Sequence, residues 1–165
     1  SMAGMDLVTA SALLDLVDGR FVGWRAEIVV EHRAALHAAL SYDGRLAFEP
    51  QDAFDTEIHA LFDAHQRTDK GFGPALGPDG WRAARDRLAE RAARVTVAGS
   101  DWRLGSEDGP IQRALLDGFA GAAIEMAPHR AARIAAWHAR RAAILAAETS
   151  RMQVGHVCLT APPPA

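Results

Sequence analysis

Several residue types are scarce in this chain of 165 residues, and each shortage excludes a class of protein. Cysteine occurs once, at Cys158, so no disulfide can form within the chain. No apolar run approaches the roughly 18 to 20 residues of a membrane-spanning helix, and no signal peptide pattern opens the chain. The net charge of −3 gives no attraction for nucleic acid or an anionic membrane. These shortages predict a cytoplasmic protein that binds neither nucleic acid nor a membrane.

Apolar residues are plentiful, so the chain can bury a core of its own. They make up 49% of the sequence, and a length of 165 residues is typical of one domain. We therefore expect a single domain over residues 3–165, and Ser1 and Met2 resemble the remnant of an expression tag. Lys70 is the only lysine among the 18 basic residues, a skew typical of a GC-rich bacterial coding sequence.

Hydrophobic periodicity predicts strands that alternate with helices, which is typical of an α/β fold with parallel pairing. The last predicted strand follows a long helical stretch, and an antiparallel edge strand is common on such sheets. The predicted strands cover residues 6–9, 35–41, 94–99 and 153–160, with an extension over 45–49. The predicted helices begin near residues 17, 52, 80, 110 and 130. About four strands make only half of a doubly wound sheet.

Turn-forming, helix-capping, glycine and proline residues predict where these strands and helices begin and end. Asp43-Gly44 after the second strand is a strong turn signal, and Asp52 or Asp55 can cap the helix that follows. Three glycines and two prolines between Gly71 and Pro78 predict a loop without regular structure. A loop of this length within a compact domain often carries function.

The first predicted strand has the apolar character of a strand in the middle of a sheet, although only five residues precede it. No glycine-rich phosphate loop comes before it either. Two explanations stay open: the chain is a fragment of a larger α/β enzyme, or something else covers this strand.

Five segments together resemble one family. Asp6-Leu7-Val8-Thr9-Ala10-Ser11-Ala12-Leu13-Leu14-Asp15 is similar to the fourth-strand motif of class I S-adenosylmethionine-dependent methyltransferases. The other four resemble the C-terminal part of one bacterial methyltransferase-like group: residues 39–45, 65–78, 100–102 and 154–156. The resemblance covers nearly the whole chain but only the second half of the family's domain.

The resemblance implies a partial Rossmann-like sheet whose strands are the family's fourth to seventh. In that family the fourth strand lies between the first and the fifth, and the sixth and seventh form an antiparallel pair at the far edge. The first half, with its Gly-x-Gly-type loop and its acidic residue for the ribose, has no counterpart here. We therefore expect an open edge near Leu7 and Val8, covered by a second copy, as in a dimer, or by a missing N-terminal half.

The ends of the first two predicted strands hold candidate ligand contacts, because open α/β sheets bind ligands at carboxyl ends of strands. The resemblance places Ala10, Ser11 and Ala12 beside the methionine end of the cofactor; their small size would equally serve tight strand-to-helix packing. Tyr42 could contact a small-molecule substrate, or it could be a packing residue beside the Asp43-Gly44 turn.

The segment from His65 to Gly73 is the strongest candidate for chemistry, because it gathers many different polar groups. His65 is a candidate general base by residue type. Arg67, Asp69 and Lys70 are candidate substrate ligands, since cations could hold a carboxylate or phosphate. The alternative is a polar helix end whose cations favour the helix dipole and whose Gly71 is a cap.

Three other candidate sites have weaker support from the sequence. Trp102 is a candidate substrate wall, although a tryptophan after a strand is more often a packing residue. The histidine spacings do not fit a zinc site on a helix, and no second cysteine assists, so we expect no metal. A Ser-His-Asp hydrolase lacks its Gly-x-Ser-x-Gly elbow.

Together these patterns predict a methyltransferase-like α/β domain. The resemblance implies methyl transfer from S-adenosylmethionine to a small molecule, and we expect this fragment to be inactive by itself. The alternative is a non-catalytic α/β module that self-associates or binds a partner through the open edge near Leu7 and Val8.

Overall fold

The computed structural model describes residues 6–164, so the predicted tag remnant at Ser1 and Met2 lies outside the described residues. The chain forms two compact units. Unit 1 comprises residues up to Gly44, residues 66–101 and residues from Gly155 onward, and unit 2 comprises residues 45–65 and 102–154. The prediction of a single domain stays a prediction, and each unit is described by itself.

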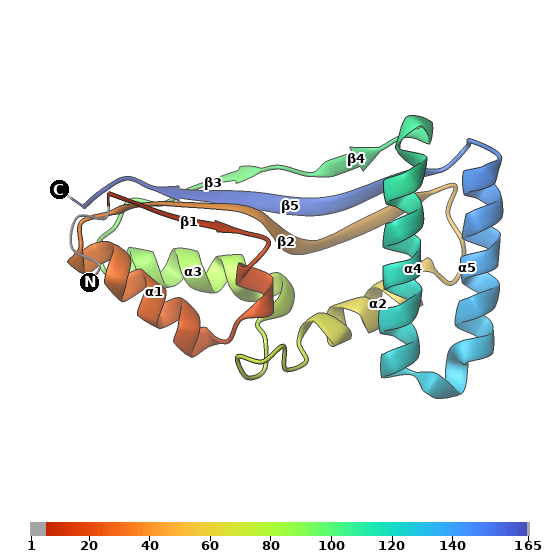
Figure 1. Ribbon diagram of the computed structural model, residues 1–165, viewed down its shortest axis with the longest axis horizontal. Helices are drawn as coiled ribbons and strands as arrows, with labels where there is room; N and C mark the ends of the chain where they lie inside the picture. Colours follow the sequence, from red (N-terminus) through yellow and green to blue (C-terminus); the bar gives the residue numbers. More distant parts are fainter. Residues whose placement is uncertain (1–5, 165) are drawn as a thin grey trace. The chain divides into compact units, whose positions relative to one another are not determined.

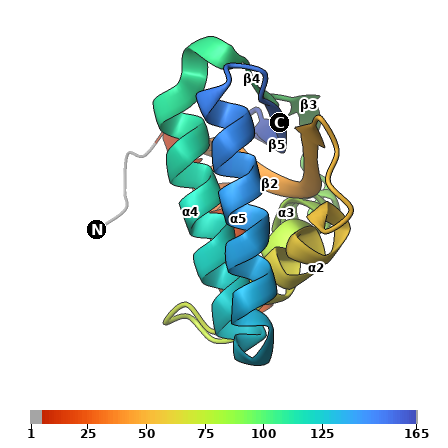
Figure 2. The same cartoon turned by 90° about the vertical axis from the view of Figure 1, so that its right-hand side faces the viewer.

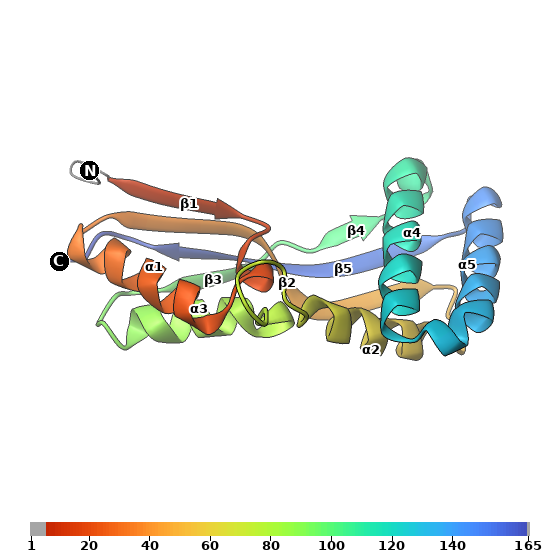
Figure 3. The same cartoon turned by 60° about the horizontal axis from the view of Figure 1, so that its bottom comes forward.

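Unit 1 contains a mixed sheet. Its strands are β1 (Leu7–Ser11), β3 (Thr96–Gly99) and parts of the long strands β2 (Ala35–Glu49) and β5 (Arg151–Ala161). They follow the order β1-β2-β5-β3, with β1 at the border of the sheet (Figure 3). The predicted α/β class and all four predicted strands are therefore confirmed.

The direction of the strands also agrees with the sequence pattern. β1 runs parallel to β2, with Leu7 opposite Ala35 and Ser11 opposite Ala39. β3 runs antiparallel to β5, with Thr96 opposite Thr160. The parallel first pair was predicted from the order of the elements, and the antiparallel final pair was implied by the resemblance. The last strand is not the edge strand that the sequence pattern suggested, because β5 lies between β2 and β3.

Helices α1 (Gly19–Glu31) and α3 (Gly80–Ala89) cover one face of this sheet (Figure 1). α1 begins where the Asp18 side chain accepts a hydrogen bond from the backbone N–H of Phe21, at 2.8 Å. Two apolar clusters join the helices to the strands. Their buried members are Leu14, Val17, Val22, Ala38, Ala84, Val157 and Leu159 in one, and Ala26, Val29, Leu36, Leu88, Ala93 and Ala161 in the other.

The start of α3 lies against the short 3-10 helix η1 (Leu14–Leu16) that follows β1. A Cβ atom placed on Gly80 would lie 2.0 Å from the backbone oxygen of Leu14, a distance that no side chain can tolerate. Only glycine at this position lets the helix approach η1, so this contact fixes where η1 leaves the sheet.

Unit 2 is built on two helices that pack side by side, α4 (Gly109–Met126) and α5 (Ala131–Ala146) (Figure 2). It also holds most of α2 (Asp55–Gln66) and the short strand β4 (Trp102–Leu104), which is antiparallel to β5. Aromatic rings fill its core: Phe48 lies 5.7 Å from Trp137 and 6.0 Å from Phe119 between ring centroids. Pro110 near the start of α4 and Pro128 after its end occupy the predicted positions.

Two local predictions were wrong. Asp43-Gly44 is not a turn, because β2 continues through it to Glu49 and Gly44 adopts a φ of +88° within the strand. Pairing with neighbouring strands overrides the local turn preference. Trp102 does not end a strand but begins β4, opposite Val154.

Between Asp6 and Pro164 the structure contains no helix whose length and apolarity would let it cross a membrane.

The contact between Gly80 and Leu14 gives a stability prediction. Gly80→Ala should lower the free energy of unfolding by about 2 kcal/mol or more, because the added methyl group overlaps a backbone atom. Gly118→Ala is the matched control, since a Cβ there meets no neighbour within 4 Å and the change should stabilise α4 by about 0.5 to 1 kcal/mol. Urea unfolding measures both, and equal effects of the two changes would contradict the packing described.

Candidate functional site

Several polar side chains of unit 1 are buried on β2, on β5 and on the segment that follows β1. Asp15 lies in η1, directly after β1, and is 8% exposed. Ser41 and Asp43 belong to β2, and His156 belongs to β5. All are buried, and Ser41 is only 1% exposed. Charged and polar groups are rarely buried, so this part of unit 1 is the candidate site.

Asp15 is buried because its neighbours in the sequence belong to the apolar core. Leu14 and Val17 belong to the apolar cluster under the sheet, and the intervening turn of 3-10 helix buries Asp15 with them. Burial raises the pKa of the Asp15 carboxyl above its ordinary value, and this effect outweighs a backbone hydrogen bond and the charge of His156, which lower the pKa. Asp15 is thus a carboxyl group that holds its proton more strongly than an exposed aspartate.

Among the described residues of unit 1, four buried polar atoms have no hydrogen-bond partner. They are Oδ1 of Asp15, Oγ of Ser41, Oε1 of Gln66 and Nε1 of Trp81. Leaving such an atom unsatisfied costs about 1 to 3 kcal/mol, and buried polar atoms are normally satisfied by protein, ordered water or a bound molecule. The carboxyl and amide oxygens accept hydrogen bonds, the indole N–H of Trp81 donates one, and the Ser41 hydroxyl can do both.

Tyr42 and His156 lie beside each other in this region. Their rings meet edge to face with centroids 6.5 Å apart. The backbone of His156 is held by two residues that follow β3: its N–H donates to Oδ1 of Asp101 at 3.3 Å, and its C=O accepts from Ser100 N–H at 2.8 Å. Tyr42, a predicted substrate contact, thus joins the buried polar residues, and it is fully buried rather than exposed to a substrate.

Polar side chains of the predicted loop after α2 stabilise the conformation of the loop itself. Oδ1 of Asp69 accepts hydrogen bonds from the N–H groups of Gly71 (2.7 Å) and Gly73 (3.0 Å). Arg67 pairs with Asp79 at 2.8 Å. Lys70 is half-buried. These contacts stabilise the conformation of the loop, and both interpretations of Arg67, Asp69 and Lys70 stay predictions.

The predicted base and the predicted substrate wall belong to the other unit. His65 lies in the last turn of α2, within unit 2, and its Nε2 lies 2.9 Å from Oε2 of Glu125 on α4. Trp102 also belongs to unit 2, in β4. Tyr42, Arg67, Asp69 and Lys70 belong to unit 1.

The predicted cofactor contacts divide between two sides of β1. Ser11 and Ala12 are exposed, whereas Ala10 lines an apolar cavity of about 100 Å³ toward α1. Sites for small organic ligands typically measure about 300 to 1,000 Å³, so this cavity is too small for a nucleoside bearing an amino acid. The open surface at Ser11 and Ala12 could accept one end of such a molecule. We therefore derive no chemical step through S-adenosylmethionine.

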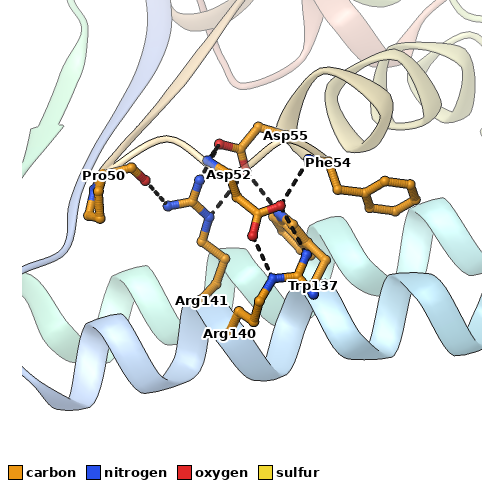
Figure 4. Close-up of polar contacts among 7 residues, drawn as sticks. All are labelled: Pro50, Asp52, Phe54, Asp55, Trp137, Arg140 and Arg141. Atoms are coloured by element: carbon orange, nitrogen blue, oxygen red, sulfur yellow. Dashed lines mark hydrogen bonds and ion pairs between the residues drawn. The ribbon is translucent and has the colours of Figure 1, made fainter.

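A second polar cluster joins the start of α2 to α5 within unit 2 (Figure 4). Arg141 is 1% exposed and pairs with Asp55, which also accepts a hydrogen bond from Nε1 of Trp137 at 2.8 Å. Arg140 binds both oxygens of Asp52, at 2.6 and 2.9 Å. Every charge of this cluster is paired, which is typical of a structural anchor.

Both predicted caps of α2 take part in this cluster. Oδ1 of Asp52 accepts from the N–H of Phe54 (2.9 Å), and Oδ2 of Asp55 accepts from the N–H of Asp52 (2.7 Å). The hydrogen bond from Arg140 lowers the pKa of Asp52 to about 2. The cap therefore stays ionised throughout the neutral range.

The described residues contain no group of three or more histidine, cysteine, aspartate or glutamate side chains placed to hold a metal ion.

Sequence reasoning did not predict the burial of Asp15, Ser41 and His156, and it considered Ser41 and His156 only for the hydrolase that it rejected. A faint signal existed for two of them. Asp15 is the only charge in Leu13-Leu14-Asp15-Leu16-Val17, and His156 interrupts the apolar strand Val154–Leu159. A single polar residue within an apolar run is buried with its neighbours, so it needs a special reason to be there.

A comparison with models of protein families finds no matching family, and a search of curated proteins finds no match to the chain.

The raised pKa of Asp15 predicts a pH dependence of stability. Between the unfolded pKa of about 3.9 and the higher folded value, the folded chain holds a proton that the unfolded chain has lost. The free energy of unfolding therefore decreases as pH rises through this range. Asp15→Asn cannot ionise, so its stability relative to the native chain should increase from pH 4 upward, measured by urea unfolding.

Asp18→Asn is the matched control for Asp15→Asn. A hydrogen bond from Phe21 N–H, followed by Arg20, lowers the pKa of Asp18 below its ordinary value. Asp18 therefore stabilises the folded chain above the unfolded pKa, and this contribution disappears as pH falls through the folded value. The two variants should diverge in opposite directions as pH rises, and parallel curves would contradict the burial of Asp15.

The paired arginines of α5 predict unequal losses of stability. Arg141→Ala should cost about 3 to 5 kcal/mol, because it leaves Asp55 without its buried partner. Arg140→Ala removes a cation whose side chain is 51% exposed and should cost about 1 kcal/mol or less. The smaller loss should vanish as pH falls through about 2, where Asp52 protonates. Similar losses for both variants, in urea unfolding at pH 7, would refute this assignment.

Proposed function

We propose that this chain is a methyltransferase-like α/β domain, related in architecture to the C-terminal half of class I S-adenosylmethionine-dependent methyltransferases. The observation that carries the proposal is the sheet order β1-β2-β5-β3, with β1 parallel to β2 and β3 antiparallel to β5. The order agrees with the resemblance, which implies a fourth strand beside the fifth and an antiparallel pair of the sixth and seventh strands at the far edge.

The location of the buried polar residues gives further support. Asp15 follows β1, and Ser41 and Asp43 lie where β2 passes the end of its pairing with β1. Ligands of open α/β sheets bind outside the carboxyl ends of parallel strands. We propose that a small-molecule substrate binds on this side, with Tyr42 near it. Arg67, Asp69 and Lys70 from the loop are the further substrate contacts proposed from the sequence, whereas Trp102 belongs to unit 2 and is not part of this proposed site.

S-adenosylmethionine, when bound, supplies an electrophilic methyl group. Methyl transfer depends mainly on the orientation of donor and acceptor, and a base is needed only where the acceptor must lose a proton. Asp15 is a stronger candidate for this base than His65, because Asp15 is buried among the polar residues with its Oδ1 unpartnered, whereas His65 contacts Glu125. Ala10, Ser11 and Ala12 remain the proposed cofactor contacts of a cytoplasmic, bacterial protein.

A second candidate function is a non-catalytic module that self-associates. The observation that favours it is the position of β1 at the border of the sheet, with the side chain of Leu7 53% exposed. A native edge strand is usually covered or charged, and this one is neither within the described residues.

Calorimetric titration with S-adenosylhomocysteine distinguishes the two candidates. A micromolar dissociation constant supports the methyltransferase-like proposal, and no heat up to millimolar ligand overturns it for this chain and favours the module. Ser11→Arg should weaken binding by about tenfold or more, because it fills the exposed surface at the end of β1. Thr96→Arg, exposed at the start of β3, should leave binding unchanged.

A further inference from the structure

An apolar cavity of about 100 Å³ is lined by members of both apolar clusters of unit 1. Val22 comes from one cluster, and Val29 and Leu88 come from the other. Short side chains leave the space between the clusters unfilled, because four of the lining residues are alanines: Ala10, Ala26, Ala38 and Ala84. Protein interiors hold few voids larger than a water molecule, so a cavity of this size is a candidate binding site.

The cavity can be reached from the surface of the molecule. Its inner wall is buried and includes Val29, Ala38 and Leu88. Phe21 and Arg25 on α1 also line the cavity, and both are only half-buried, so they form a rim that meets solvent. A small molecule can therefore enter beside these two side chains without unfolding of unit 1.

Arg25 is the one charged residue among the described residues that line the cavity. Its guanidinium lies over two aromatic rings, 5.2 Å from the ring centroid of Phe21 and 4.7 Å from that of Trp24. These contacts hold the cation at the rim, yet within residues 6–164 Arg25 forms no ion pair and no side-chain hydrogen bond. Its N–H donors therefore remain able to bind an anion at the entrance of the cavity.

We propose that this cavity binds a short unbranched carboxylate, with the alkyl chain among the apolar residues and the carboxylate against Arg25 at the rim. The inference goes beyond the proposed function, because it requires neither methyl transfer nor self-association.

The volume and the charge of the site determine this choice of ligand. The cavity of about 100 Å³ is smaller than an engineered cavity of roughly 150 Å³ that holds benzene, so about four carbons of a chain fit rather than a ring of six. Its apolar lining disfavours water and favours an alkyl chain. At the rim, the planar guanidinium of Arg25 matches a carboxylate, which can accept two parallel hydrogen bonds from it, and repels an ammonium group. A chain of four carbons that ends in a carboxylate is pentanoate.

Titration of the native chain with pentanoate, followed by methyl NMR, tests the proposal first. We expect a millimolar dissociation constant, with shifts of the methyl resonances of Val22, Val29 and Leu88 but not of Leu116 and Leu145 in unit 2. Affinity should rise about fourfold for each methylene from propanoate to pentanoate. Pentan-1-ol lacks the charge and should bind about tenfold more weakly than pentanoate. No saturable shift with pentanoate, or equal binding of pentylammonium, would overturn the proposal.

Two variants separate the roles of the cavity and of the cation. Ala84→Leu places a larger side chain in the cavity and should abolish binding of pentanoate. Arg25→Met keeps an apolar chain at the rim without the charge, so pentanoate affinity should fall about tenfold while pentan-1-ol affinity stays unchanged. Arg113→Met is the matched control, because Arg113 is exposed on α4 in unit 2 and its loss should leave binding of both ligands unchanged.

Unchanged pentanoate binding by a folded Ala84→Leu variant would overturn the proposal. If that variant does not fold, the comparison of Arg25→Met with Arg113→Met decides, and equal affinities of these two variants for pentanoate would also overturn it. Binding of S-adenosylhomocysteine is measured separately with the native chain, so failure of one proposal does not imply failure of the other.

Discussion

The parallel pairing of β1 with β2 is the constraint on which most of unit 1 depends. It fixes the point where the chain leaves the sheet after Ser11, and there the close contact of Gly80 with Leu14 turns η1 under the strands. That turn buries Asp15. The same pairing leaves the other side of β1 open. The candidate site and the candidate interface are therefore two consequences of one strand pair.

Buried carboxyl groups are paired with arginines in unit 2, whereas in unit 1 the carboxyl group of Asp15 has an unpartnered oxygen. In unit 2, Arg141 and Asp55 satisfy each other, and the nearby Asp52 keeps its charge because Arg140 stabilises the ionised form. In unit 1, burial dominates at Asp15, and one of its oxygens has no partner. The first arrangement stabilises the fold, whereas the second costs about 1 to 3 kcal/mol for the unsatisfied oxygen.

Local patterns predicted the helices and strands well where a periodic hydrophobic pattern was bounded by capping or helix-breaking residues. The strand before Ser11, the helix opened by Asp52 and Asp55, and the break at Pro128 were all visible in the residues. The signal failed at Asp43-Gly44, where a good turn sequence lies inside a long strand. It failed again at Trp102, because only pairing with Val154 makes that segment a strand.

The sequence by itself determined the α/β class, the alternation that makes β1 and β2 parallel, and the uncharged character of the first strand, because each depends on residues close together in the chain. Only the tertiary structure decided that Asp15, Ser41 and His156 are buried in the same unit, and that His65 and Trp102 belong to another. The physical reason is that burial and charge pairing depend on segments distant in the sequence, and no spacing rule connects Asp15 to His156.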